Sequence, residues 1–376
     1  MKVVIAAAGT GGHINPGIAI AGKIKEMEQT SDILFIGTNR GLENDLVPRA
    51  GYKLKTIRAY GIERKLTLQN IKRLYYTAKS IGEAKKILRE FGAEVVIGTG
   101  GYICMPVMIA AKKLGIPRLL HESNAFPGVS VKLLSKNVNT VMVGFEDAIQ
   151  KLPKANKVVV TGNPTKIKKR EFSDIEKANL IKQMGLKTDK PIVLVFGGSQ
   201  GAQSINQSFL EIITKKQNTN YQIMWAAGPL QYEEIKQVLK KEKLDIDHIE
   251  NVKIVPYIYN MEEVLNVVDL VVCRSGAMTI TEIAIVGKPA IFIPFPYATE
   301  NHQEYNAKVL EKVGAAKIIL DKDLNADILH QEIESIITSK QVVQEMGAKA
   351  NLCAVSQVED KIYHEIELVK KINLLR

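Results

Sequence analysis

Glycine-rich turns follow three strand-like apolar runs of this 376-residue chain. They are Gly9-Thr10-Gly11-Gly12, Gly98-Thr99-Gly100-Gly101 and Gly197-Gly198-Ser199-Gln200-Gly201. Glycine lets the backbone turn sharply and lets a phosphate group approach the amides that open the next helix. One such turn is as readily explained as a simple tight turn. Three of them, spread over both halves of the chain, predict ligand binding at the carboxyl ends of parallel strands.

A fourth segment, residues 273–282, leads from a strand into a helix through Arg274-Ser275-Gly276-Ala277. Small residues at a helix start leave the first amides open beside the positive end of the helix dipole, which suits a diphosphate. Glu282 follows one turn later and could accept hydrogen bonds from ribose hydroxyls. It could equally be an ordinary acidic residue favoured by the dipole. The dinucleotide fingerprint fails at Ile14, and no P-loop sequence occurs.

Two side chains are candidates for a general base. His13 directly follows the first glycine turn, and an imidazole titrates at about pH 6.5, which suits proton transfer. The alternative is a structural histidine that hydrogen-bonds the loop. Glu122 is the second candidate base. Arg274 or Lys166 would meet a leaving diphosphate, an electrostatic role that needs no metal.

The composition fits a globular protein, with 46% hydrophobic and 24% charged residues. The 51 Lys and Arg exceed the 40 Asp and Glu, and the resulting charge of +11 suits nucleic acid, anionic lipid or a phosphorylated substrate. Three scattered cysteines form no CxxC pair, which argues against a disulfide framework or a zinc site. The pairs Asp245/Asp247 and Asp321/Asp323 are interpreted as solvated acidic pairs, so neither a metal nor a cofactor is expected.

Strand-like and helix-like runs alternate along both halves, which predicts two α/β domains with parallel sheets. Strands are expected at residues 2–7, 33–36, 94–97, 118–121, 140–143, 192–195, 222–225, 252–255, 270–273 and 290–293. The turn Gly162-Asn163-Pro164 and the basic stretch after it mark the boundary, giving domains 1–164 and 165–356. Residues 342–372 are predicted as one amphipathic helix. No stretch of about 18 uninterrupted apolar residues occurs, so no membrane-spanning helix is expected.

Seven motifs, taken together, identify a family resemblance. They are GTGGH (9–13), GTGGY (98–102), HESN (121–124), GNP (162–164), GGSQGA (197–202), CRSGAMTITE (273–282) and NHQEYNA (301–307). In this order the chain resembles the MurG family, the UDP-N-acetylglucosamine transferases of bacterial peptidoglycan synthesis. The resemblance covers nearly the whole chain.

The resemblance implies a GT-B glycosyltransferase fold, in which two Rossmann-like domains with parallel sheets face a central cleft. The first domain would take the acceptor and face the membrane, the second would take UDP-GlcNAc, and a final helix, about 357–376, would return to the first. The implied reaction is inverting transfer of GlcNAc to the 4-hydroxyl of MurNAc in undecaprenyl-pyrophosphoryl-MurNAc-pentapeptide (lipid I), forming lipid II. The implied location is peripheral, at the cytoplasmic face of the bacterial cell membrane, with other cell-wall synthesis proteins as candidate partners.

The resemblance also implies roles for single residues. Ser199 would contact the diphosphate, together with the main chain of Ala277, Met278 and Thr279. Glu282 would bind the ribose, the backbone of Ile258 would read the uracil edge, and Gln303 and Asn306 would recognise GlcNAc hydroxyls. Thr10, Gly11, Gly12 and Asn124 would complete the site from the facing domain. Lys166 stands where the family often has Arg, which replaces a bidentate contact by a point charge, and Ser123 replaces a more usual Gln.

A lipid-linked acceptor requires an enzyme that sits on the bilayer, and residues 64–89 offer the means. Lys65, Lys72, Lys79 and Lys86 recur every seven residues and would form one stripe on a helix, beside Leu68, Tyr75 and Tyr76. Such a face suits an anionic membrane surface. The alternative is a solvated basic helix, which Ser80 and Gly82 could interrupt.

Competing functions remain open from the sequence. Another GT-B enzyme, such as a diacylglycerol glycosyltransferase or a UDP-sugar epimerase, would share the glycine turns. A nucleic-acid-binding protein is the remote alternative. It predicts aromatic residues interleaved with Lys and Arg on a sheet face, whereas here the mixing is confined mainly to one helix-like segment, so no nucleic-acid partner is expected.

Overall fold

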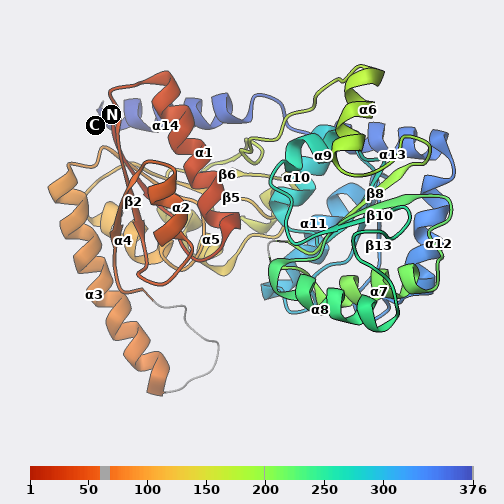
Figure 1. The fold of residues 1–376 in the computed structure, drawn as a ribbon. Helices are drawn as coiled ribbons and strands as arrows, with labels where there is room; N and C mark the ends of the chain where they lie inside the picture. Colours follow the sequence, from red (N-terminus) through yellow and green to blue (C-terminus); the bar gives the residue numbers. More distant parts are fainter. Residues whose placement is uncertain (60–67, 199, 375–376) are drawn as a thin grey trace. The chain divides into compact units, whose positions relative to one another are not determined.

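The computed structural model describes residues 1–59, 68–198 and 200–374, with the backbone alone at 68–75, 77, 78, 373 and 374. The chain divides into two compact units. Unit 1 comprises Met1–Lys166 and Val355–Arg376, and unit 2 comprises Ile167–Ala354. Each unit has a parallel sheet covered by helices (Figure 1).

The described strands of unit 1 form a seven-stranded parallel sheet in the order β3-β2-β1-β4-β5-β6-β7. These strands are β1 (Lys2–Ala6), β2 (Asp32–Gly37), β3 (Lys53–Thr56), β4 (Val95–Gly98), β5 (Arg118–Glu122), β6 (Thr140–Val143) and β7 (Val158–Val160). The helices are α1 (Gly11–Met27), α2 (Glu43–Arg49), α3 (Leu68–Phe91), α4 (Cys104–Lys113), α5 (Val129–Leu134) and α14 (Val358–Leu374), with 3-10 turns η1 (Ser135–Asn137) and η2 (Glu146–Lys151).

Strand β1 shows why the sheet of unit 1 needs helices on both faces. Val4 and Ala6 point into the core that α3 and α4 cover, while Val3 and Ile5 point into the core that α1 and α14 cover. All four side chains are fully buried. A strand buried on both faces is apolar without alternation, as its sequence predicts.

Helix α14 belongs to unit 1 and lies beside α1 (Figure 1). Its apolar positions, from Val358 to Val369, join the core of α1 and β1. Lys23 and Asp360 form an ion pair at 2.8 Å between the two helices. The prediction of one helix over 342–372 is wrong. The segment breaks into α13 (Lys340–Leu352) and α14, and Gln357 takes a φ of 54° where the chain turns between them.

Helix α3 runs through Ser80 and Gly82 without interruption. The hydroxyl of Ser80 donates to the carbonyl of Tyr76 at 2.6 Å, within the helix. Ala84 and Leu88 of α3 are fully buried in the core of unit 1.

The described strands of unit 2 form a six-stranded parallel sheet in the order β10-β9-β8-β11-β12-β13. These strands are β8 (Ile192–Phe196), β9 (Gln222–Ala226), β10 (Val252–Val255), β11 (Leu270–Cys273), β12 (Ala290–Phe292) and β13 (Ala316–Ile318). The helices are α6 (Asp174–Gln183), α7 (Gln203–Thr214), α8 (Pro229–Lys241), α9 (Met261–Val267), α10 (Ala277–Val286), α11 (His302–Glu311), α12 (Ala326–Ile337) and α13, with the 3-10 turn η3 (Thr299–Asn301).

The core of unit 2 is anchored by Trp225 on β9. Its indole N–H donates to Oδ1 of Asn206 at 2.9 Å, so the buried polar atom of this large side chain is satisfied. Phe209 of α7 lies against the Trp225 ring, with ring centroids 6.2 Å apart. Helix α7 is thereby fixed to the sheet immediately after the glycine turn that follows β8.

All ten strands expected from the sequence are present, and three further strands, β3, β7 and β13, lie at sheet edges. Among the described helices, none combines the length and the apolar character needed to cross a bilayer.

Candidate active site

The two sheets repeat one strand order, and this order fixes where loops gather. In unit 1, β1, β4 and β5 are neighbours, and in unit 2, β8, β11 and β12 are neighbours. In each sheet the order reverses beside the first of these strands, and ligands bind at that point, outside the carboxyl ends of the strands. The glycine turns predicted from the sequence follow β1 and β4 in unit 1 and β8 in unit 2.

In unit 1, His13 lies in the first turn of α1 and packs against the turn that follows β4. Gly100 has a φ of +116°, and a Cβ added to it would come within 2.3 Å of His13 Nδ1, so only glycine fits there. The hydroxyl of Thr99 donates to the His13 carbonyl at 2.7 Å. The β4 turn therefore fixes the histidine. Thr10 and Gly12 are exposed beside it, and Gly11 is half-buried.

A buried carboxylate that the sequence analysis missed supports the first glycine turn. Glu43, fully buried at the start of α2, accepts hydrogen bonds from the Gly9 amide at 3.0 Å and from the amide and hydroxyl of Thr38 at 2.8 and 2.6 Å. Burial raises the pKa of Glu43, but the hydrogen bonds from Thr38 and Gly9 outweigh it and leave the pKa lowered. The negative charge is thus held beneath the turn.

Glu122, at the end of β5, resembles Glu43 in that its carboxylate accepts hydrogen bonds from loop amides. One oxygen accepts the backbone amide of Asn124 at 2.9 Å and its side-chain amide at 3.0 Å, and the other accepts the Gly128 amide at 2.8 Å. Glu122 is buried, so these bonds fix the loop and orient Asn124. Glu122 and Asn124, both predicted site residues, therefore lie at the carboxyl ends of the unit 1 strands, as His13 does.

The histidine of the same motif, His121, is fully buried and its Nε2 lies 3.1 Å from the Gly162 carbonyl. Burial lowers the pKa of His121 to about 4, so the ring is neutral near pH 7. Asn163 donates to the Ser123 carbonyl at 3.0 Å. Lys166 is exposed at the end of unit 1.

In unit 2, the first amides of α10 are open to a ligand. Gly276 is the N-cap, and the first bond within the turn runs from the Ile280 amide to the Gly276 carbonyl. The amides of Met278 and Thr279 have no acceptor among the described residues. Ala277 is buried beneath them. This geometry, with the helix dipole behind it, suits an anion such as a diphosphate.

A cavity of about 660 Å³ lies at this edge of unit 2. Its lining combines the β8 turn, the start of α10 and the loop after β12: Gly197, Gly198, Gln203, Ser204, Gln207, Arg274, Gly276, Thr279, Phe295, Tyr297, Gln303 and Asp321 are among the lining residues. Ser199, predicted to contact a diphosphate, lies outside the described residues. The structure therefore gathers several predicted residues around one cavity.

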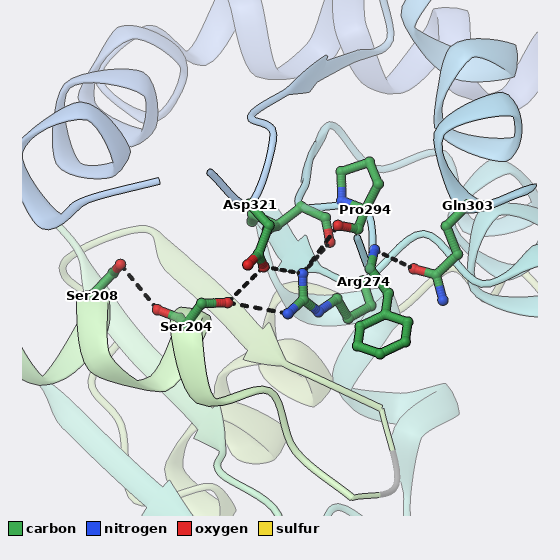
Figure 2. Close-up of polar contacts among 8 residues, drawn as sticks. Ser204, Ser208, Arg274, Pro294, Gln303 and Asp321 are labelled. Atoms are coloured by element: carbon green, nitrogen blue, oxygen red, sulfur yellow. Dashed lines mark hydrogen bonds and ion pairs between the residues drawn. The ribbon is translucent and has the colours of Figure 1, made fainter. Parts of the chain in front are cut away.

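Arg274 lines the cavity, but protein groups hold its guanidinium (Figure 2). One nitrogen, Nη1, donates to the carbonyls of Ile293 and Pro294 at 3.0 and 3.1 Å and to Oδ1 of Asp321 at 2.5 Å. The expectation of a solvated acidic pair is therefore wrong for Asp321, whereas Asp245 is exposed and lies 2.7 Å from His248. Among the described residues, no three His, Cys, Asp or Glu side chains gather as a metal site.

The remaining predicted donor residues lie around the same sheet edge. Oε1 of Gln303 accepts the Phe295 amide at 3.0 Å. Asn306 is fully buried and donates to the Ser275 carbonyl at 3.3 Å, which fixes the turn before α10. Glu282 is half-buried on α10. Ile258 lines a second cavity, of about 220 Å³.

The predicted membrane residues are described only in part. Lys79 and Lys86 are exposed on α3 and Tyr76 is half-buried. Lys65 and the side chains of Leu68, Lys72 and Tyr75 lie outside the described residues.

A second exposed apolar and basic face of unit 1, on α5, was missed by the sequence analysis. Val129 and Leu133 are 42% and 56% exposed, and Lys132 lies 3.7 Å above the Phe126 ring. The signal for this face was the four-residue spacing of Val129 with Leu133 and of Lys132 with Lys136.

The chain matches two family models. Residues 3–143 match the glycosyltransferase family 28 N-terminal domain, and residues 192–362 match the glycosyltransferase family 28 C-terminal domain. Among curated proteins, it is 45% identical over 372 residues to the UDP-N-acetylglucosamine–N-acetylmuramyl-(pentapeptide) pyrophosphoryl-undecaprenol N-acetylglucosamine transferase of Thermoanaerobacter sp. (strain X514), covering 99% of this chain and 100% of that protein. The protein of the same name from Ruminiclostridium cellulolyticum is 42% identical over 372 residues, with the same coverage.

Among solved structures, the chain is similar to MurG of Acinetobacter baumannii, with a TM-score of 0.78 and 28% identity over 97% of this chain and 99% of that one. The UDP-GlcNAc 2-epimerase from Neisseria meningitidis bound to UDP-GlcNAc has a TM-score of 0.65 at 16% identity, over 98% of this chain and 100% of that one. At that identity the likeness shows a shared fold alone.

Proposed function

The chain belongs to the family of UDP-N-acetylglucosamine–N-acetylmuramyl-(pentapeptide) pyrophosphoryl-undecaprenol N-acetylglucosamine transferases, and from this premise we propose its reaction. It transfers GlcNAc from UDP-GlcNAc to the MurNAc unit of lipid I and forms lipid II, a step of peptidoglycan synthesis. The observation that carries this function is identity of 41–45% to curated members over the full chain.

Unit 2 takes the donor in this proposal. The open amides of Met278 and Thr279 and the 660 Å³ cavity support a diphosphate seat at the start of α10. Ser199 adds a contact to the diphosphate, Glu282 binds the ribose and the Ile258 backbone reads the uracil. Gln303 and Asn306 recognise the sugar. Because the buried Asn306 amide also holds the Ser275 carbonyl, it couples sugar recognition to the turn that seats the diphosphate.

Unit 1 supplies the acceptor side and the base. The acceptor hydroxyl oxygen bonds to C1 of GlcNAc, the bond from C1 to the diphosphate oxygen breaks, and the hydroxyl proton passes to His13. Attack opposite the leaving group inverts C1. The fixed position of His13 against Gly100 supports this role, whereas both oxygens of Glu122 already accept hydrogen bonds from its own loop. Thr10, Gly11, Gly12 and Asn124 bind substrate beside His13.

The leaving UDP carries the developing negative charge. The amides at the start of α10 stabilise it through fixed dipoles, which need no reorganisation during the reaction. Lys166 adds a point charge from the end of unit 1. Arg274 contributes its charge from within the cavity wall, where Asp321 partly offsets it.

The enzyme works as a peripheral protein at the cytoplasmic face of the membrane. The α3 lysines that are described, Lys79 and Lys86, are exposed, and the α5 face adds Val129 and Leu133 beside Lys132. Apolar residues flanked by lysines suit an anionic lipid surface, at roughly 1 kcal/mol per basic residue. Two faces of unit 1 therefore contribute to membrane binding.

Product analysis tests the function. The full chain is incubated with UDP-GlcNAc alone, with lipid I in vesicles, or with diacylglycerol in vesicles. We expect a GlcNAc-bearing lipid product and free UDP only with lipid I. A new UDP-sugar from UDP-GlcNAc alone would indicate an epimerase, and a glycosylated diacylglycerol would indicate the other transferase; either result without lipid II would refute the proposal.

A further inference from the structure

A series of contacts links Asp321, in the cavity wall of unit 2, to Gln303, the side chain proposed to bind the sugar. It starts at Asp321, which follows β13 and is half-buried in the cavity wall. Oδ1 of Asp321 accepts hydrogen bonds from Arg274 Nη1 at 2.5 Å and from the Ser204 hydroxyl at 2.7 Å. Arg274 Nη2 donates to the same hydroxyl at 3.1 Å, which closes a triangle of three side chains from three separate segments of the chain (Figure 2).

Arg274, held by Asp321 and Ser204, also binds the loop after β12. The nitrogen that meets Asp321 also donates to the carbonyls of Ile293 and Pro294, and the guanidinium lies 5.6 Å from the centre of the Phe295 ring. A charged, planar donor held by a carboxylate and two carbonyls has little freedom to rotate. The main chain of residues 293–295 is fixed as a result.

The next contact orients Gln303. The amide of Phe295 donates to Oε1 of Gln303 at 3.0 Å, and Figure 2 shows the side-chain nitrogen at the opposite end of the Gln303 amide. With its oxygen held by the loop, Gln303 presents an N–H donor, which suits a sugar hydroxyl oxygen as acceptor. Its side chain lines the same cavity as Asp321.

We propose that Asp321 is a positioning residue for sugar recognition, acting through Arg274 and the 293–295 main chain on the amide of Gln303. The inference rests on the proposed function, because Gln303 is taken as the reader of the GlcNAc group. Asp321 does not touch the sugar in this account. The diphosphate seat at Met278 and Thr279 makes no hydrogen bond to Asp321, so loss of the Asp321 carboxylate is not expected to weaken the binding of UDP itself.

The substitution Asp321→Asn keeps the shape of the side chain and removes its charge. We expect UDP-GlcNAc to bind about tenfold more weakly, as for the loss of one well-oriented hydrogen bond, while the dissociation constant of UDP stays within about twofold of the wild type. Discrimination against UDP-glucose and UDP-GalNAc falls in parallel. Asp323→Asn is the matched control, since Asp323 is exposed two residues further along and its substitution is expected to change none of these constants.

A double-mutant cycle separates positioning from a general structural role. If Asp321 acts through Gln303, then Asp321→Asn adds little to Gln303→Ala, because the second change removes the group that the first one misplaces. Isothermal titration of the four proteins with UDP and UDP-GlcNAc gives the cycle. Ser204→Ala removes the hydrogen bonds of this hydroxyl to Asp321 and Arg274 but leaves the ion pair between those two residues, so it provides a milder variant if Asp321→Asn unfolds.

Equal weakening of UDP and UDP-GlcNAc, or additive effects in the cycle, would overturn the positioning role. So would an Asp321→Asn protein that binds both ligands like the wild type. None of these outcomes affects the proposed function, which the wild-type transfer assay tests separately. A wild-type protein that does not bind UDP-GlcNAc would instead overturn the function.

Discussion

The two sheets follow one strand order, but the backbone amides in the loops at their carboxyl ends have different hydrogen-bond partners. In unit 1, buried carboxylates lie beneath the loops: Glu43 holds the Gly9 amide, and Glu122 holds the amides of Asn124 and Gly128. In unit 2, the amides of Met278 and Thr279 make no hydrogen bond to a described residue. Unit 1 therefore places buried carboxylates beneath two of its loops, whereas the first amides of α10 in unit 2 are left as open donors.

We expect this difference to divide the proposed chemistry between the units. Open amides at a helix start attract an external anion, so unit 2 suits the diphosphate of the donor. Buried carboxylates repel an anion, and they fix polar loops that suit a hydroxyl acceptor and a base. If the units divide the reaction in this way, a substitution in one unit should leave the function of the other unchanged.

The largest effect is expected from the base of unit 1. Replacing His13 by Asn removes the proposed proton acceptor while keeping a polar side chain, so kcat is expected to fall about 10³-fold. UDP-GlcNAc binding should change little, because the proposed donor seat lies in unit 2. Steady-state transfer to lipid I and isothermal titration provide the two readouts.

The control is His364→Asn, a change of the same chemistry at an exposed position of α14. It should leave kcat at the wild-type value. A His13→Asn protein with full activity would remove His13 as the base and leave Glu122 as the remaining candidate.

Acid should lower the free energy of unfolding of unit 1, because His121 is buried in its neutral form. Its folded pKa, about 4, lies below the unfolded value of about 6.5, so the unfolded chain binds more protons as the pH falls. The free energy of unfolding therefore falls between pH 6.5 and 4, by at most about 3 kcal/mol from this residue. Urea unfolding at pH 7 and 4.5 should show a smaller loss for His121→Asn. An equal loss in both proteins would contradict the assignment.

The dissociation constant of UDP should depend on Glu282 and be independent of Glu122. Glu282→Gln replaces the carboxylate that we propose accepts a hydrogen bond from a ribose hydroxyl, and this change is expected to weaken UDP binding about tenfold. Glu122→Gln should leave the UDP dissociation constant unchanged, even though it loosens the Asn124 loop and reduces transfer. If both substitutions weakened UDP binding equally, the division between the two edges would fail.

The smallest effect concerns membrane binding. Leu133→Asp places a negative charge on the exposed face of α5, and we expect about threefold to tenfold weaker binding to anionic vesicles. Leu352→Asp is the matched control, since Leu352 is 83% exposed on unit 2. Cosedimentation with vesicles at two salt concentrations measures both. Equal losses for the two variants would assign the effect to net charge rather than to α5.

The sequence predicted the central strands but not most of the edges. Central strands such as β1 are buried on both faces and therefore appear as continuous apolar runs. β3 and β13 have only four and three residues, with charged and partly exposed side chains, and β7 has three half-buried valines. Pairing with a neighbouring strand, rather than an apolar run, makes these segments strands.

For the candidate site too, the sequence predicted only the residues that have a local signal. The glycine turns and the small residues before α10 carry local signals, and the structure places them at the sheet edges as expected. Glu43 and Asp321 do not carry such signals, because their partners Gly9 and Arg274 lie 34 and 47 residues away along the chain. An acidic residue has no distinctive sequence context until the fold brings its donors together.

The most direct test of the two-edge account is a titration of isotopically labelled protein with UDP, followed by amide NMR. The account predicts that the amide signals of Gly198, Met278 and Thr279 shift as UDP fills the seat at the start of α10. The signals of Gly9 and Gly128 should stay in place, because Glu43 and Glu122 already hold these amides. Shifts at Gly9 and Gly128 without shifts at Met278 and Thr279 would contradict the account.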